Sequence, residues 1–193
     1  MKSILIVIVV LALVAVLVFG MYVDRRNEMV RKKETINAAW SQVDVVIQRR
    51  ADLIPNLVET VKGIAAQEQS VFGEIARARS ALLNAKTPPD RIAANQQLDG
   101  ALGRLLLVVE NYPQLKSNEN FLRLQDELAG TENRIAVERR RYNEALKDYN
   151  TYIGLFPNNL VAGFAGFSRN DAYFEAAPAS REAPKVQFPG PKG

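Results

Sequence analysis

The amino-terminal apolar run is the feature that most limits what this chain can fold into. From Ser3 to Val23 the sequence contains no charged residue. An α-helix of that length measures about 31 Å, which matches a bilayer hydrocarbon core of about 30 Å. The sequence therefore predicts a short tail at residues 1–3 and a transmembrane helix at residues 4–23. The chain from Asp24 onward then folds outside the bilayer.

A cleaved signal peptide is the competing interpretation, because Lys2 supplies the basic start that signal peptides carry. The apolar run is longer than the 7–15 residues typical of a signal peptide, and no small-x-small cleavage pattern precedes Asp24. Lipoprotein processing is excluded because the chain has no cysteine. An uncleaved single-pass signal-anchor fits these observations better.

Basic residues next to the apolar run predict its orientation. Only Lys2 and the α-amino group precede it, whereas five basic residues follow it closely: Arg25, Arg26, Arg31, Lys32 and Lys33. The positive-inside rule then places the amino terminus outside and the following domain in the cytoplasm. The same residues are candidates for contact with the membrane surface, and each contributes about 1 kcal/mol of attraction to anionic lipid when it lies close enough.

The residue types that are missing narrow the chemistry. The chain contains neither cysteine nor histidine, which excludes disulfides, thiolate nucleophiles, Ser-His-Asp triads and the usual zinc and haem ligands. The carboxylates Asp44, Asp52, Glu59 and Glu68 have no metal-binding loop around them. We expect no catalytic residue, no metal and no cofactor, and therefore no enzyme.

Apolar residues recur every seven positions along most of the chain, which predicts long helices packed at shallow angles. One series runs through Ile36, Val43, Arg50, Leu57, Ile64, Val71 and Ala78, and a second through Phe121, Leu128, Ile135, Tyr142, Tyr149 and Phe156. No strand pattern stands out. The sequence predicts an all-α fold, with an antiparallel up-and-down bundle of long helices over residues 24–156 after the transmembrane helix.

Several helix boundaries can be placed from the sequence. Thr87 is a predicted cap, with Pro88 at the first helical position and Asp90 completing a capping box. Ser117 is predicted to cap the next helix, and Pro157 to end the last long one. Residues 157–175 are apolar and contain glycine, so we expect them to pack on the bundle. Residues 176–193 are rich in Pro and Ala and are predicted to be extended or disordered, with Val186 and Phe188 able to dock locally.

Pro55 leaves the number of helices open. A proline inside a helix removes one hydrogen bond and clashes with the carbonyl four residues earlier. The heptad series continues through this position, which favours one kinked helix and a three-helix bundle. A tight hairpin at Pro55 would instead produce four helices.

Several motifs together resemble the LemA family of bacterial membrane proteins, in the expected order along nearly all of the chain after the apolar run. They are AWSQVDV at 39–45, RRADLIPNLVETVKG at 49–63, ENYPQLKS at 110–117, ELAGTENRI at 127–135, RYN at 141–143, YN at 149–150 and FP at 156–157. The resemblance implies an amino-terminal anchor in the bacterial cytoplasmic membrane and a cytoplasmic four-helix bundle. It therefore favours a hairpin at Pro55. It implies no reaction.

Arg50 is the one charged residue in its heptad series. It either pairs with a carboxylate of the last long helix, Glu132 or Glu138, or helps to bind an anionic ligand. The pairing is favoured because a buried arginine without a partner is costly. The alternative site would combine Arg49, Arg50 and Lys62, with Asp52 close by in the sequence.

Our leading functional hypothesis is a membrane-anchored helical scaffold without catalytic activity. Its expected partners are the lipid bilayer, further copies of itself in a homo-oligomer, and unidentified proteins. The runner-up is a membrane-linked sensor that binds a small anion or lipid headgroup through Arg49, Arg50 and Lys62. Nucleic-acid binding is not expected, because the basic cluster on the last long helix is interleaved with acids. That cluster comprises Arg134, Arg139, Arg140 and Arg141, among Glu127, Glu132, Glu138 and Glu144.

Overall fold

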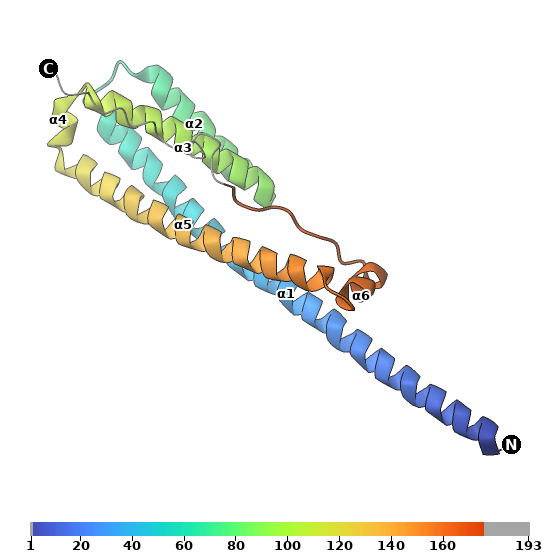
Figure 1. Ribbon diagram of the computed structural model, residues 1–193. Helices are drawn as coiled ribbons and strands as arrows, with labels where there is room; N and C mark the ends of the chain where they lie inside the picture. Colours follow the sequence, from blue (N-terminus) through green and yellow to red (C-terminus); the bar gives the residue numbers. More distant parts are fainter. Residues whose placement is uncertain (1, 176–193) are drawn as a thin grey trace, which may run out of the picture.

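The computed structural model describes residues 2–175, which form helices and connecting turns with no strand (Figure 1). The predictions for residue 1 and for the tail at 176–193, including Val186 and Phe188, lie outside the described residues. The all-α prediction is confirmed. The helices are α1 (Lys2–Lys62), α2 (Gln69–Asn84), α3 (Pro88–Glu110), α4 (Pro113–Lys116), α5 (Glu119–Gly154) and α6 (Asn158–Ala165).

The four long helices alternate in direction, and they form two closely packed antiparallel pairs, α1 with α5 and α2 with α3 (Figure 1). The α2–α3 pair covers the part of the α1–α5 pair that is far from the amino terminus. The apolar first third of α1 projects beyond the bundle, and its large side chains are exposed. Among the described residues this is the one helix long and apolar enough to cross a membrane.

The hairpin favoured at Pro55 is wrong, because α1 continues through Pro55 to Lys62. Proline has no N–H to offer the carbonyl of Ala51, four residues earlier. Arg79 of α2 supplies the missing donor, since its Nε donates to the Ala51 carbonyl oxygen at 2.8 Å. The neighbouring helix thus satisfies the polar group that the proline leaves free, and the helix can continue.

The first break in the bundle comes after Lys62 instead, in a turn at residues 63–68. The Ala65 N–H donates to the Val61 carbonyl at 2.8 Å, and the Ala65 side chain is buried. The bundle therefore does have four long helices. The heptad series from Ile36 to Ala78 is not one helix, however, because its last two members, Val71 and Ala78, lie on α2.

The predicted cap of α3 is confirmed, and the predicted cap of α5 is wrong. The backbone N–H of Asp90 donates to Thr87 Oγ1 at 3.3 Å, and Pro88 opens the helix. At α5 the cap is Asn118, whose Oδ1 accepts from the Phe121 N–H at 3.0 Å. Ser117 instead closes the short helix α4 by donating to the Gln114 carbonyl.

The core draws on all four long helices and includes members of both heptad series, among them Val43, Ile135 and Tyr142. Its fully buried members include Val43, Ile47, Ile54 and Val61 from α1, Ile75 and Leu82 from α2, Leu98 and Leu105 from α3, and Ile135, Tyr142 and Leu146 from α5. Phe156 was expected to end the second series in the core, and this is wrong. It is 79% exposed, because α5 ends at Gly154 and the chain turns before α6.

After α5 the chain turns back on itself. Helix α6 packs on both α1 and α5, and Gly166 ends it in the left-handed conformation (φ 74°) that favours glycine. Residues 167–174, which we call the return segment, then run back along α5. Side chains of α5 hold its backbone: Tyr149 Oη donates to the Ser168 carbonyl at 2.9 Å, and Asn143 bonds both the N–H and the carbonyl of Phe174.

Candidate functional site

Arg50 lies at the centre of the most unusual polar cluster of the bundle. It occupies a core position of α1 and is only 7% exposed. Its guanidinium contacts Asp99 of α3 and lies 2.8 Å from Glu132 of α5. One buried arginine thus links α1, α3 and α5.

Arg139 and Asn95 complete this cluster, which we call the Arg50 network. The Arg139 guanidinium lies 3.9 Å from Asp99 and 4.0 Å from Glu132, and Asn95 Nδ2 donates to Asp99 at 3.3 Å. Two cations face two anions, so the cluster is close to neutral. That balance offsets much of the desolvation free energy of the buried Arg50 guanidinium. A lone buried charge would have no such compensation.

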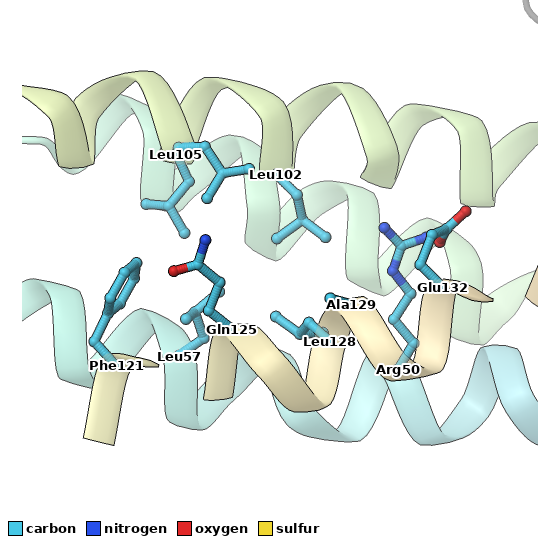
Figure 2. A pocket seen from close by; sticks show the side chains of 10 residues that line it. Arg50, Leu57, Leu102, Leu105, Phe121, Gln125, Leu128, Ala129 and Glu132 are labelled. Carbon is cyan, nitrogen blue, oxygen red and sulfur yellow. The ribbon is translucent and has the colours of Figure 1, made fainter. Parts of the chain in front are cut away.

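An apolar cleft opens beside the Arg50 network, between α3 and α5 and above α1. It encloses about 210 Å³. Figure 2 shows Arg50 and Glu132 at one end and Phe121 at the other, with Leu102 and Leu105 above. The lining residues are Arg50, Leu57, Leu102, Leu105, Leu106, Phe121, Gln125, Leu128, Ala129 and Glu132.

The three cations of the alternative anion site do not come together. Arg49 is exposed on another face of α1 from the buried Arg50. Lys62 lies twelve positions further along the helix, about 18 Å away by the rise of an α-helix. Its Nζ pairs with Glu59 at 3.1 Å and lies over the Phe72 ring. The structure therefore gives no support to a ligand site built from these residues.

The other predicted candidates have separate partners. Asp52 accepts a hydrogen bond from Gln48 at 3.0 Å on the exposed side of α1. Glu138 pairs with Arg141 at 2.8 Å, one turn along α5, whereas Glu132 lies against Arg50. Of the carboxylates considered for Arg50, the structure thus brings Glu132 and not Glu138 to it.

Asp99, Asn95 and Arg139 are the members of the network that sequence reasoning missed. Asp99 sits on the α3 face that also carries Asn95, Leu102 and Leu106, at helical spacings of three and four. A lone acid on that partly apolar face was the available signal. No sequence signal pointed to Arg139, since it belongs to a run of three arginines and such runs are typical of a solvated surface.

The four carboxylates considered for metal binding lie apart. Asp44 pairs with Arg91 of α3, while Asp52 and Glu59 have the partners given above. Glu68 accepts a hydrogen bond from Tyr112 Oη at 3.1 Å, and this bond raises the pKa of the phenol. Within residues 2–175 no group of three or more acidic side chains is placed to hold a metal ion.

The basic residues next to the apolar run differ in their contacts. Arg31 pairs with Glu28 at 2.8 Å, and Lys32 lies 4.0 Å from Glu28 and above the Tyr152 ring. Within the described part of the chain, Arg25, Arg26 and Lys33 form no ion pair. These three charges are therefore available to other ligands.

Comparison with known proteins identifies the family. The sequence model of the LemA family matches residues 39–188. The chain belongs to the LemA family. It is 34% identical to magnetosome protein MamQ 2 of Paramagnetospirillum magneticum over 91% of this chain and 73% of that protein. It is 32% identical to MamQ of Magnetospirillum gryphiswaldense, covering 80% and 66% of the two chains, and 29% identical to protein LemA of Metamycoplasma hominis, covering 75% and 66%.

The LemA match coincides with the bundle and not with the apolar run. It begins at Ala39, in the second half of α1, and includes the Arg50 network and every residue that lines the cleft. The family relation and the exposed apolar part of α1 together make this a membrane-associated helical protein.

Proposed function

We propose that this LemA-family chain is a membrane-anchored helical scaffold that associates with further copies of itself and catalyses no reaction. Its α1 anchor crosses the cytoplasmic membrane with the amino terminus outside, and the bundle extends into the cytoplasm. The basic residues after Val23 support that orientation. The names of its relatives refer to a cellular structure or to the family, and none refers to a reaction.

The observation that carries the proposal is the open cleft between α3 and α5. Helix bundles gain stability by burying apolar side chains between neighbouring helices. Here α3 and α5 leave Leu102, Phe121 and Leu128 lining a hollow. Such a hollow is suited to receiving apolar side chains from outside the bundle.

A second copy of the chain is the occupant that we propose. Leu106 lines the cleft and is itself exposed, and Leu122 is exposed one heptad before the cleft residue Ala129. Two copies can therefore each offer leucines to the other's cleft in a two-fold symmetric contact. Their anchors hold them at the same height in one membrane, which raises their effective concentration.

The test is the oligomeric state of the full chain after extraction from membranes, by light scattering coupled to size exclusion. We expect the wild-type chain to be a dimer or larger and Leu106→Asp to be a monomer. Leu107→Asp is the matched control, because Leu107 is the next residue and more exposed but lies outside the cleft. It should leave the oligomer intact.

Disulfide crosslinking supplies a second readout in the membrane itself. The natural chain has no cysteine, so Leu106→Cys introduces a unique thiol. We expect oxidation to produce dimers from Leu106→Cys at several times the yield from Leu107→Cys. A wild-type chain that is monomeric at every concentration, or equal behaviour of the two positions, would overturn the proposal.

A further inference from the structure

A second apolar surface lies at the opposite end of the bundle from the cleft. Between Gly154 and Ser168 the sequence contains no charged residue. Within this stretch four large apolar side chains are exposed, with Phe156 at 79% and Phe164 at 87%. We call this surface the α6 apolar face; it consists of Leu155, Phe156, Leu160 and Phe164.

The orientation of α6 explains why these side chains are outside. Asn158 and Ala162, one turn apart, are the buried residues of the helix. Leu160 and Phe164, also one turn apart, point about 200° away from them by the 100° turn per residue of an α-helix. The helix thus packs on the bundle through small residues and turns its large apolar residues outward. A surface helix of a water-soluble protein instead turns its apolar residues inward.

The position of α6 along α1 suggests what covers this face. Lys32 Nζ lies 5.4 Å from the centre of the Tyr152 ring, so the end of α5 is level with Lys32. Lys32 is about 13 Å beyond Val23, the last residue of the apolar run, by the helical rise. Helix α5 runs toward the apolar run, and Figure 1 shows α6 beside α1 just beyond the end of α5.

A lipid headgroup layer is about 5–8 Å thick on each side of the hydrocarbon core. The outer part of α6 therefore reaches that layer when α1 leans toward α6, and transmembrane helices lean by about 20° on average. The nearby charges suit an anionic surface, since within residues 2–175 Arg25, Arg26 and Lys33 form no ion pair.

We propose that the α6 apolar face inserts into the interface of the anionic leaflet at the base of the anchor. The chain then holds the membrane at two places, through the span of α1 and through α6. An eight-residue helix binds weakly by itself, but the span keeps it beside the bilayer. The double contact fixes the direction in which the bundle leans. This inference does not depend on self-association through the cleft.

Fluorescence quenching in vesicles tests the proposal with the full chain. The chain is reconstituted at low protein-to-lipid ratio in vesicles containing phosphatidylglycerol, with a polarity-sensitive probe on a single introduced cysteine at Leu160→Cys. A nitroxide attached to the lipid acyl chain near its headgroup end should quench this probe. Matched probes at Asn159→Cys, on the adjacent side of α6, and Leu107→Cys, at the far end of the bundle, should be quenched much less.

A double variant distinguishes insertion of the α6 apolar face into the bilayer from its simply lying near the bilayer. Burial of one phenylalanine shifts an equilibrium by about tenfold or more, so Phe156→Ser with Phe164→Ser should return quenching of the Leu160→Cys probe to the Asn159→Cys level. Thermal unfolding followed by circular dichroism should be unchanged, because both phenylalanines are exposed. Vesicles of neutral lipid should show weaker quenching of the same probe.

Two results would overturn the proposal. One is equal lipid quenching at Leu160→Cys and Leu107→Cys. The other is efficient disulfide dimer formation at Phe164→Cys that persists as protein is diluted in lipid and in the Leu106→Asp background, because a second copy would then cover the α6 apolar face.

Discussion

The two halves of the bundle are stabilised in different ways. In the half nearest the apolar run, α1 and α5 form a pair whose groove is closed by the return segment. Trp40, Tyr142 and Phe174 pack there with ring centres 5.3 to 6.1 Å apart. In the far half, α2 and α3 are added, and the Arg50 network lies beside an open cleft.

The two halves therefore differ in how completely their helices pack. The near half is stabilised by aromatic packing and by hydrogen bonds from α5 side chains to the return-segment backbone. In the far half α3 and α5 lie apart along the cleft. The ion pairs of the Arg50 network connect the two helices there. A region that opens or accepts another segment is expected where packing is incomplete.

The largest effect should follow from removing the aromatic centre of the near half. Tyr142 is 1% exposed and contacts both Trp40 and Phe174. Tyr142→Ala should lower the free energy of unfolding by about 3–5 kcal/mol. Urea unfolding of the detergent-solubilised chain, followed by the fluorescence of its single tryptophan, Trp40, measures this. Tyr142→Phe, which keeps the ring, should cost about 1 kcal/mol or less; equal losses in both variants would contradict the aromatic account.

A smaller effect is expected from the centre of the far half. Arg50→Ala should cost about 1–2 kcal/mol, less than a fully buried pair, because water can reach its partners. The side chains of Asp99 and Glu132 are 35% and 43% exposed. Arg49→Ala is the neighbouring control and should change stability by about 0.5 kcal/mol at most. The same urea titration compares them, and an unchanged midpoint for Arg50→Ala would show that the network is not structural.

The return segment provides a local test of the closed half. Asn150 donates to the Asn170 carbonyl at 2.7 Å and to Tyr173 Oη at 2.9 Å, and it accepts from the Asn170 N–H. Asn150→Ala should cost about 1 kcal/mol and speed hydrogen exchange at the amides of Asn170 and Phe174. Asp148→Ala, at an exposed position of α5, is the control. Unchanged exchange at these amides would mean that ring packing and the bonds from Asn143 and Tyr149 hold the segment without Asn150.

The smallest effect is expected from alkaline pH, which should gradually lower the free energy of unfolding by destabilising the near half. Burial raises the pKa of Tyr142 and of Tyr149, so the fold favours their neutral phenols. Their contribution is fully present below the unfolded pKa of about 10 and is lost as pH rises through the higher folded pKa. Urea midpoints measured from pH 8 upward should fall above about pH 10. The fall should be shallower in Tyr142→Phe, and an identical fall would assign it to other groups.

The sequence by itself determined the apolar run, the helical class, the Thr87 cap and the inward position of Arg50, because each depends on spacing within a single helix. Local periodicity also misled where a helix ended. Phe156 continued the heptad series, yet α5 stops at Gly154 and leaves its ring exposed.

The tertiary structure decided the rest, because the deciding partner lies far along the chain. Pro55 is tolerated in α1 since Arg79 of α2 bonds the carbonyl that the proline leaves free. Arg50 finds Asp99 on α3 as well as Glu132 on α5. Which helix stands next to which is set by packing of the whole bundle, and spacing within one helix carries no information about it.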